Sequence, residues 1–297
     1  MRIFMKSKII FTNIVLTFIL SIPSISHAEI LNKDTGKYNN IYLSTQYKPA
    51  IPVFNNFSVS EKDQNTALLV ALTSDINNTN INNNEKISLP QHFTTPYHAQ
   101  FQNSIISFSG TIGQYLPKNL RVEIEGSYKS FDVKNPGYYD VNDAYRYFAL
   151  ARNVKNNSYQ PQDNKPNNPT KLAYYTIMKN YGVSIMSVLL NGCYDIPVDK
   201  LKASPYICLG IGVDTIEFFE TLHIKFAYQC KVGISYLILP QVSLFADGYY
   251  HKVKNNQFKN LNTIQVRMLA NNPKITYAAA TLNISYFGAE IGARFTF

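Results

Sequence analysis

The sequence contains no tryptophan, and only 16% of its 297 residues are charged. Beyond its first 20 residues it has no run near the ~20 consecutive apolar residues that a membrane-spanning helix needs. It also lacks the Gly-x-Ser-x-Gly signature of hydrolases and the His-Glu-x-x-His signature of zinc proteases. Gly210-x-Gly212 lacks the third glycine of a dinucleotide site, and no lysine/arginine block with interleaved aromatics suits a nucleic acid. These absences argue against a helical membrane protein, the commonest enzyme classes and a nucleic-acid partner.

The amino terminus has the three parts of a secretory signal peptide. A basic head precedes an apolar run over residues 9–20, and Ser26-His27-Ala28 is a small-x-small site. We therefore expect residues 1–28 to be removed by cleavage after Ala28, which leaves residues 29–297 as one domain. An exported chain without a spanning helix is either a soluble protein or a membrane β-barrel.

Cysteine is scarce, with Cys193, Cys208 and Cys230 the only three. An odd number in an exported protein leaves at least one thiol free or paired with another molecule. Cys193 and Cys208 flank one expected turn and are one candidate pair. Strand parity turns Cys208 inward and Cys230 outward, which argues against a bridge between those two. The spacing fits no zinc pattern, so we expect no metal and no other cofactor.

What the chain has in abundance is two-residue alternation of apolar and polar side chains, together with 22 tyrosines and 18 phenylalanines. Such alternation is typical of a strand with one polar and one apolar face, and tyrosine suits the girdles of membrane barrels. The expected strands are 40–48, 104–113, 120–131, one within 174–190, 206–213, 223–236, 242–252 and the carboxy-terminal segment 286–297.

The carboxy-terminal segment Glu290-Ile-Gly292-Ala-Arg-Phe295-Thr-Phe297 resembles the signal that bacterial outer-membrane barrels present to their assembly machinery. We therefore expect Glu290, Gly292, Phe295 and Phe297 to be read by that machinery. An ordinary strand of a soluble sheet is the alternative for this segment.

Long and short connections broadly alternate, as they do when one set faces the outside and the other the periplasm. The long ones are 49–103, 132–173 and 253–276, and residues 145–152 have the character of a short surface helix. We predict an all-β fold, a transmembrane antiparallel up-and-down β-barrel of about eight strands with long extracellular loops. A soluble exported sandwich is the alternative.

The inward faces of these strands carry an unusual number of charges. They are Arg121, Glu123, Glu125, Lys129, Lys225, Lys231, Asp247, Glu290 and Arg294. One interpretation is a paired network that fills a narrow barrel, and the other is a charged ring that selects solutes. Eight strands favour the filled interior, whereas twelve or more would favour a channel. Asp247 and His251 share a face, but four residues separate them by ~13 Å, too far for a direct acid–base pair.

Several motifs, taken together and in order, resemble one family. They include Tyr42-Leu-Ser-Thr-Gln-Tyr-Lys-Pro49, Arg121-Val-Glu-Ile-Glu-Gly-Ser-Tyr128, Ser204-Pro-Tyr-Ile-Cys-Leu-Gly-Ile-Gly212 and Ser243-Leu-Phe-Ala-Asp-Gly-Tyr-Tyr-His-Lys252. The chain thereby resembles the major surface antigen family of ehrlichial and anaplasmal bacteria. Residues 59–96 and 153–169 match least, and position 230 departs by carrying cysteine where glycine is usual.

The resemblance implies a surface-exposed outer-membrane antigen whose variable loops meet host-cell molecules and antibodies, and for some members a porin. It supplies no catalytic residues. The partners we expect are outer-membrane lipid, the barrel assembly machinery and host molecules, with no nucleic acid. Passive diffusion of small solutes is the second hypothesis for function, and a barrel hydrolase the third.

Overall fold

A computed structural model describes residues 41–73, 90–136, 143–153, 175–198, 203–264 and 276–297. The expected signal peptide, residues 1–28, lies outside the described residues. Among the residues that are described, no helix is long and apolar enough to cross a membrane.

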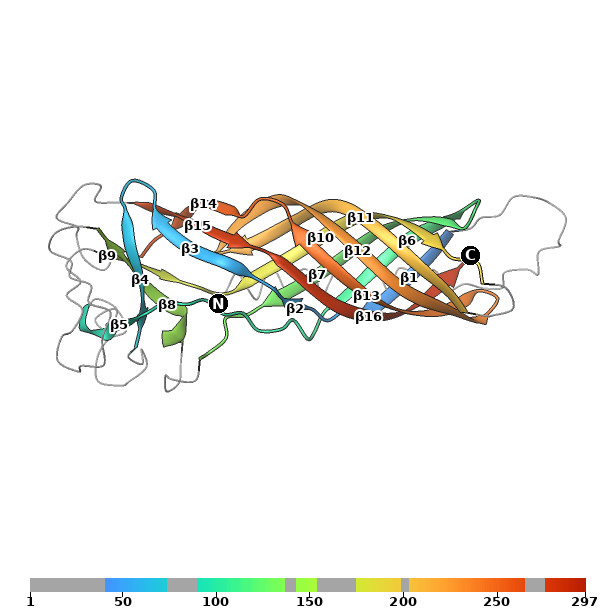
Figure 1. Ribbon diagram of the computed structural model, residues 1–297, viewed down its shortest axis with the longest axis horizontal. Helices are drawn as coiled ribbons and strands as arrows, with labels where there is room; N and C mark the ends of the chain where they lie inside the picture. Colours follow the sequence, from blue (N-terminus) through green and yellow to red (C-terminus); the bar gives the residue numbers. More distant parts are fainter. Residues whose placement is uncertain (1–40, 74–89, 137–142, 154–174, 199–202, 265–275) are drawn as a thin grey trace. The chain divides into compact units, whose positions relative to one another are not determined.

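Eight antiparallel strands form a closed barrel (Figure 1). They are β1 (Ile41–Tyr47), β6 (Phe108–Leu116), β7 (Leu120–Phe131), β10 (Val183–Asp195), β11 (Ala203–Phe218), β12 (Thr221–Leu239), β13 (Val242–Val253) and β16 (Ser285–Thr296). Each strand pairs with the next in this order, and β16 pairs back with β1. A closed sheet leaves no unpaired backbone edge, which is the condition for crossing lipid with strands. The predicted fold class and barrel strand number are confirmed.

The register around the barrel fixes its width. One row of paired residues runs Leu43, Ile112, Ile124, Leu190, Ile211, Tyr228, Lys252, Ser285. Leu43 also pairs with Phe295 on the closing strand, so the row returns displaced by 295 − 285 = 10 residues. Eight staggered strands enclose an interior just wide enough for side chains to fill.

Alternation along each strand separates a lipid-facing wall from a polar interior. Phe226, Val232 and Ile291 point outward and are 72%, 63% and 64% exposed. Their sequence neighbours Lys225, Lys231 and Glu290 point inward and are buried. The apolar side chains are therefore not covered by other parts of the described chain, and the soluble sandwich is ruled out.

The described parts of the long connections, together with the residues that directly follow them, form further short strands. These are β2 (Ile51–Pro52), β3 (Asn55–Glu61), β4 (Thr66–Leu72), β5 (Phe93–Pro96), β8 (Tyr147–Arg152), β9 (Tyr175–Lys179), β14 (Gln257–Asn262) and β15 (Tyr277–Asn283), with 3-10 turns at Pro90–His92 and Ala144–Arg146. β14, β15 and β3 form one sheet, and β5, β4, β8 and β9 form another (Figure 1). We call these two sheets the cap. Because long connections face the outside, the cap is extracellular.

Two predictions of local structure were wrong. The segment 145–152 is a short 3-10 turn followed by strand β8, not a helix. Residues 148–152 are all buried, and β8 pairs with β4 and β9, so tertiary pairing overrides the local helical tendency. The expected strands 206–213 and 223–236 are both too short where they face each other, because β11 and β12 continue as a hairpin in which only Phe219 and Glu220 turn, both with positive φ.

Candidate functional site

The centre of the barrel interior is crossed by four alternating charges, which we call the ion quartet: Lys48, Glu125, Lys231 and Glu290. Lys231 Nζ lies 2.7 Å from Glu125 and 2.8 Å from Glu290. Lys48 Nζ lies 3.0 Å from Glu290 and also pairs with Glu125. These side chains come from four different parts of the barrel wall and are at most 3% exposed. Buried charges are tolerated when paired in this way.

Two amides complete the hydrogen bonds of the quartet. Asn191 Nδ2 and Gln229 Nε2 each donate to Glu125 at 3.1 Å. Lys48 Nζ donates to Gln229 Oε1 at 3.0 Å. Glu125 therefore accepts from four donors, and the network ties opposite walls of the barrel together.

A second charged layer lies toward the periplasmic turns. Arg121 Nε donates to both Asp195 carboxylate oxygens at 2.8 and 3.0 Å, and its Nη1 pairs with Glu123. Tyr42 OH donates to Glu123 at 2.5 Å. Arg294 Nη2 lies 3.9 Å from the same carboxylate. This layer fills the periplasmic end of the interior.

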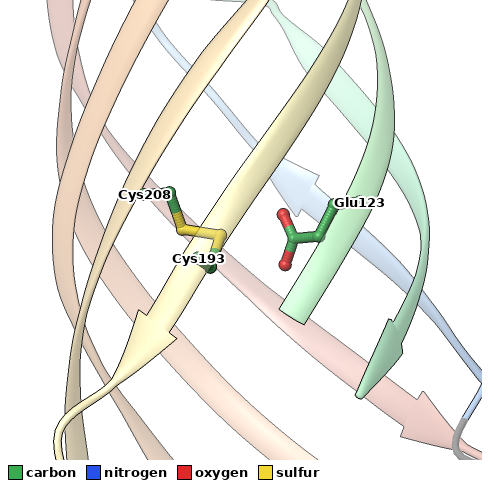
Figure 2. Close-up of side chains that lie close together, drawn as sticks. All are labelled: Glu123, Cys193 and Cys208. Carbon is green, nitrogen blue, oxygen red and sulfur yellow. A yellow bond between two sulfur atoms is a disulfide. The ribbon is translucent and has the colours of Figure 1, made fainter. Parts of the chain in front are cut away.

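Cys193 and Cys208 form a disulfide across β10 and β11, next to Glu123 on β7 (Figure 2). The potential ligand atoms of these three side chains lie within 4.8 Å of one another. The two sulfurs are bonded to each other, however, and a metal ligand must be a thiolate. Cys230 is a free, exposed thiol on the outer wall. The candidate pair and the outward parity of Cys230 are both confirmed.

Little space separates the charged layers. A cavity of about 10 Å³ is lined by Glu123, Lys231, Asp247, Glu290 and Arg294, among others. That volume is close to the minimum for one water molecule. At this level, the side chains of the described interior leave room for about one water molecule.

Toward the cap, the interior becomes more aromatic. His251 Nε2 lies 2.8 Å from Asp214 Oδ2, and the His251 ring stacks on Tyr286 with centroids 4.5 Å apart. Asp247 instead accepts from Tyr206 OH at 2.5 Å. Asp247 and His251 thus have different partners, and they do not form an acid–base pair.

The cap has its own apolar core, which continues into the barrel mouth. Tyr97 and Phe148 stack with centroids 4.3 Å apart, and Phe57 packs edge-on against Phe148 and Phe218. The same cluster includes Phe131 and other barrel residues at the strand ends. Such packing holds the cap at a fixed position on the barrel.

The cap also contains ion pairs, some buried and some at its surface. Arg152 Nη2 pairs with Glu61 at 2.7 Å, and both side chains are fully buried. At the surface, Arg146 pairs with Asp132 at 2.6 Å and with Asp143 at 3.1 Å. Burial alone would raise the pKa of Asp143, but the Lys179 hydrogen bond and the positive charges nearby hold that pKa below its ordinary value.

The nine lumen-facing charges named from the sequence are all buried inside the barrel. Lys225 donates to the Gln257 backbone oxygen at 2.8 Å, and Lys129 Nζ lies 5.3 Å from the Tyr286 ring centroid. Of the expected assembly residues, Glu290 belongs to the quartet, and Phe295 and Phe297 point outward. A Cβ at Gly292 would meet the Phe245 ring at 2.6 Å.

The structure also brings in residues that sequence reasoning missed. Lys48 belongs to the ion quartet, Asn191 and Gln229 donate to its member Glu125, and Asp214 hydrogen-bonds to His251. The inward parity of Lys48 and Gln229 was a signal for both. Asp214 was missed because the strand expected there ended at residue 213.

The chain is similar to known proteins in sequence and in structure. The sequence profile of a family described as surface antigen matches residues 33–297. Major surface antigen 4 of Anaplasma marginale is 30% identical over 260 residues, which span 87% of this chain and 84% of that protein. Among solved structures, Neisserial surface protein A is 9% identical with a TM-score of 0.39, covering 86% of this chain and 97% of that one. The attachment invasion locus protein of Yersinia pestis is 9% identical with a TM-score of 0.32, covering 87% and 99%.

Proposed function

Because the chain belongs to the surface antigen family, we propose that this surface-exposed outer-membrane protein presents a folded cap to host-cell molecules and antibodies. The barrel is the anchor, and the cap is the part that meets a partner. The observation that carries this proposal is the contrast between a filled interior and an extracellular region with its own core.

Passive solute diffusion is the alternative, and the interior argues against it. The ion quartet crosses the barrel at its centre, and the Arg121 layer and the aromatic mouth fill the interior on either side. A porin would need these layers to move apart. Separating a buried charge from its partner costs about 3–5 kcal/mol. We therefore infer that the resting barrel does not conduct.

We also propose that the chain acts without catalysis. A barrel hydrolase would need an acid and a base in contact near an accessible nucleophile. Asp247 and His251 hydrogen-bond to Tyr206 and Asp214 instead, and both are buried.

Three measurements on the full chain test the proposal. Folded protein in planar bilayers is expected to give no conductance above that of lipid alone. Cells that display the full chain are expected to adhere to host cells. An antibody against the connection between β3 and β4, residues 62–65, is expected to label these cells intact. Steady single-channel conductance would favour the porin, and failure of that antibody to reach intact cells would refute the display of the cap.

A further inference from the structure

The outer wall of the barrel is almost free of charge. On the outward faces of the eight barrel strands, the charged side chains are Glu217 on β11 and Lys252 on β13. Lys254, directly after β13, keeps the outward parity of Lys252, and both lysines are exposed. Two lysines therefore follow one another at the cap end of a single lipid-facing strand.

These lysines lie beside the most apolar part of the wall. Lys252 pairs with Tyr228 on β12, and the Lys254 backbone N–H donates to Phe226 O at 2.8 Å. The neighbouring outward side chains Ile224 and Phe226 are 77% and 72% exposed. The two cations thus lie at the cap end of a lipid-facing strand, beside exposed apolar side chains.

Neither amine has an ion-pair or hydrogen-bond partner within the described part of the chain. Their Cα atoms are about 7 Å apart, two residues along one strand, so both flexible side chains reach the same point. A lysine at this depth extends its amine toward the headgroups while its stem stays on apolar surface. Two such amines suit the oxygens of one phosphate.

We propose that Lys252 and Lys254 hold the phosphate of an outer-leaflet phospholipid whose acyl chains lie along Phe226 and Tyr228. The site takes an anionic lipid in preference to a zwitterionic one, because two unpaired cations meet the headgroup. It fixes one lipid at the junction of barrel and cap.

Titration of the detergent-solubilised full chain with phosphatidylglycerol and phosphatidylcholine, read by native mass spectrometry, tests this site. Each lysine near the surface contributes about fivefold to the affinity for an anionic lipid. We expect K252Q/K254Q to weaken phosphatidylglycerol binding about thirtyfold and phosphatidylcholine binding by a smaller factor. K252R/K254R is expected to keep the wild-type affinity.

Lys62→Gln is the matched control, since Lys62 is exposed on the connection between β3 and β4 in the cap, away from the barrel strands. It is expected to leave lipid binding unchanged. Heat-modifiable migration on gels confirms that each variant is folded. Equal phosphatidylglycerol affinity of K252Q/K254Q and wild type, or an equal loss in Lys62→Gln, would overturn the proposal.

Discussion

Substitution of Glu125 by glutamine tests the claim that the ion quartet stabilises the barrel. Glu125 is fully buried and accepts from Lys48, Lys231, Asn191 and Gln229. Glutamine keeps the shape but removes the negative charge, so two buried lysines are left with Glu290 as their one carboxylate partner in the quartet. Removing one partner of a buried ion pair costs about 3–5 kcal/mol. We expect Glu125→Gln to lower the free energy of unfolding by that amount.

Urea unfolding of protein reconstituted in phospholipid vesicles measures the effect. The chain has no tryptophan, so circular dichroism or the heat-modifiable gel shift must report folding instead of tryptophan fluorescence. A loss of 4 kcal/mol reduces the folded-to-unfolded ratio about a thousandfold. Glu220→Gln, at the exposed tip of the β11–β12 hairpin, is the control and should change stability by no more than about 0.5 kcal/mol.

A second substitution distinguishes loss of charge balance from loss of packing. Adding Lys231→Met to Glu125→Gln leaves Lys48 opposite Glu290, one cation with one anion. Removing both members of a buried ion pair leaves no uncompensated buried charge, so we expect the double variant to recover part of the loss. A loss below about 1 kcal/mol in Glu125→Gln, or as large a loss in Glu220→Gln, would refute the role given to the quartet.

Three further predictions concern the covalent and terminal features of the chain. Cys193→Ala/Cys208→Ala opens a link between residues 15 apart and should destabilise the barrel by about 3 kcal/mol in the same urea assay; unchanged unfolding would contradict this. Deletion of Phe297 should reduce the folded fraction in the outer membrane more than Phe287→Ala does, and equal yields would remove the assembly signal. Mass spectrometry of the mature chain should find cleavage after Ala28, and an intact amino terminus would exclude a cleaved signal peptide.

Sequence reasoning located the barrel because most wall strands obey a single period. In β12, polar and apolar residues alternate over most of a 19-residue strand, and no competing pattern obscures it. The strand from Leu120 to Phe131 has the bounds that alternation predicts. Lipid outside and side chains inside impose the same two-residue period on every strand, so local pattern and final structure agree.

The cap could not be predicted in the same way. Strand β8 has no alternation, because β8 is buried on both faces, with Phe148 and Leu150 in one core and Ala149 and Ala151 in another. A short apolar run of that kind is ambiguous between helix and strand until its partners are known. Of its partners, β4 belongs to another connection, and β9 lies later in the same connection as β8, so no local signal identifies them.

The sequence identified the inward-facing charges, but it could not identify which of them form ion pairs with one another. Lys48 and Glu290 are separated by most of the chain, and they meet because the first and last barrel strands pair. The sequence shows which charges face inward, but the closing register decides which of them touch. The sequence therefore predicted that Lys231 faces inward, but it could not predict that Lys231 pairs with Glu125 and Glu290.

Because the pairing of these charges depends on how the barrel closes, the ion quartet also helps to determine the register between β1 and β16. A slip of one residue between β1 and β16 would turn Glu290 into lipid and expose its charge to hydrocarbon. A slip of two residues keeps the parity but moves Glu290 about 7 Å from Lys48, beyond ion-pair distance. The apolar wall residues disfavour a slip of one residue, because such a slip exchanges the two faces of the strand. They do not disfavour a slip of two residues. Charges paired across the closing seam penalise both errors, so the polar interior helps select the one register in which this barrel closes.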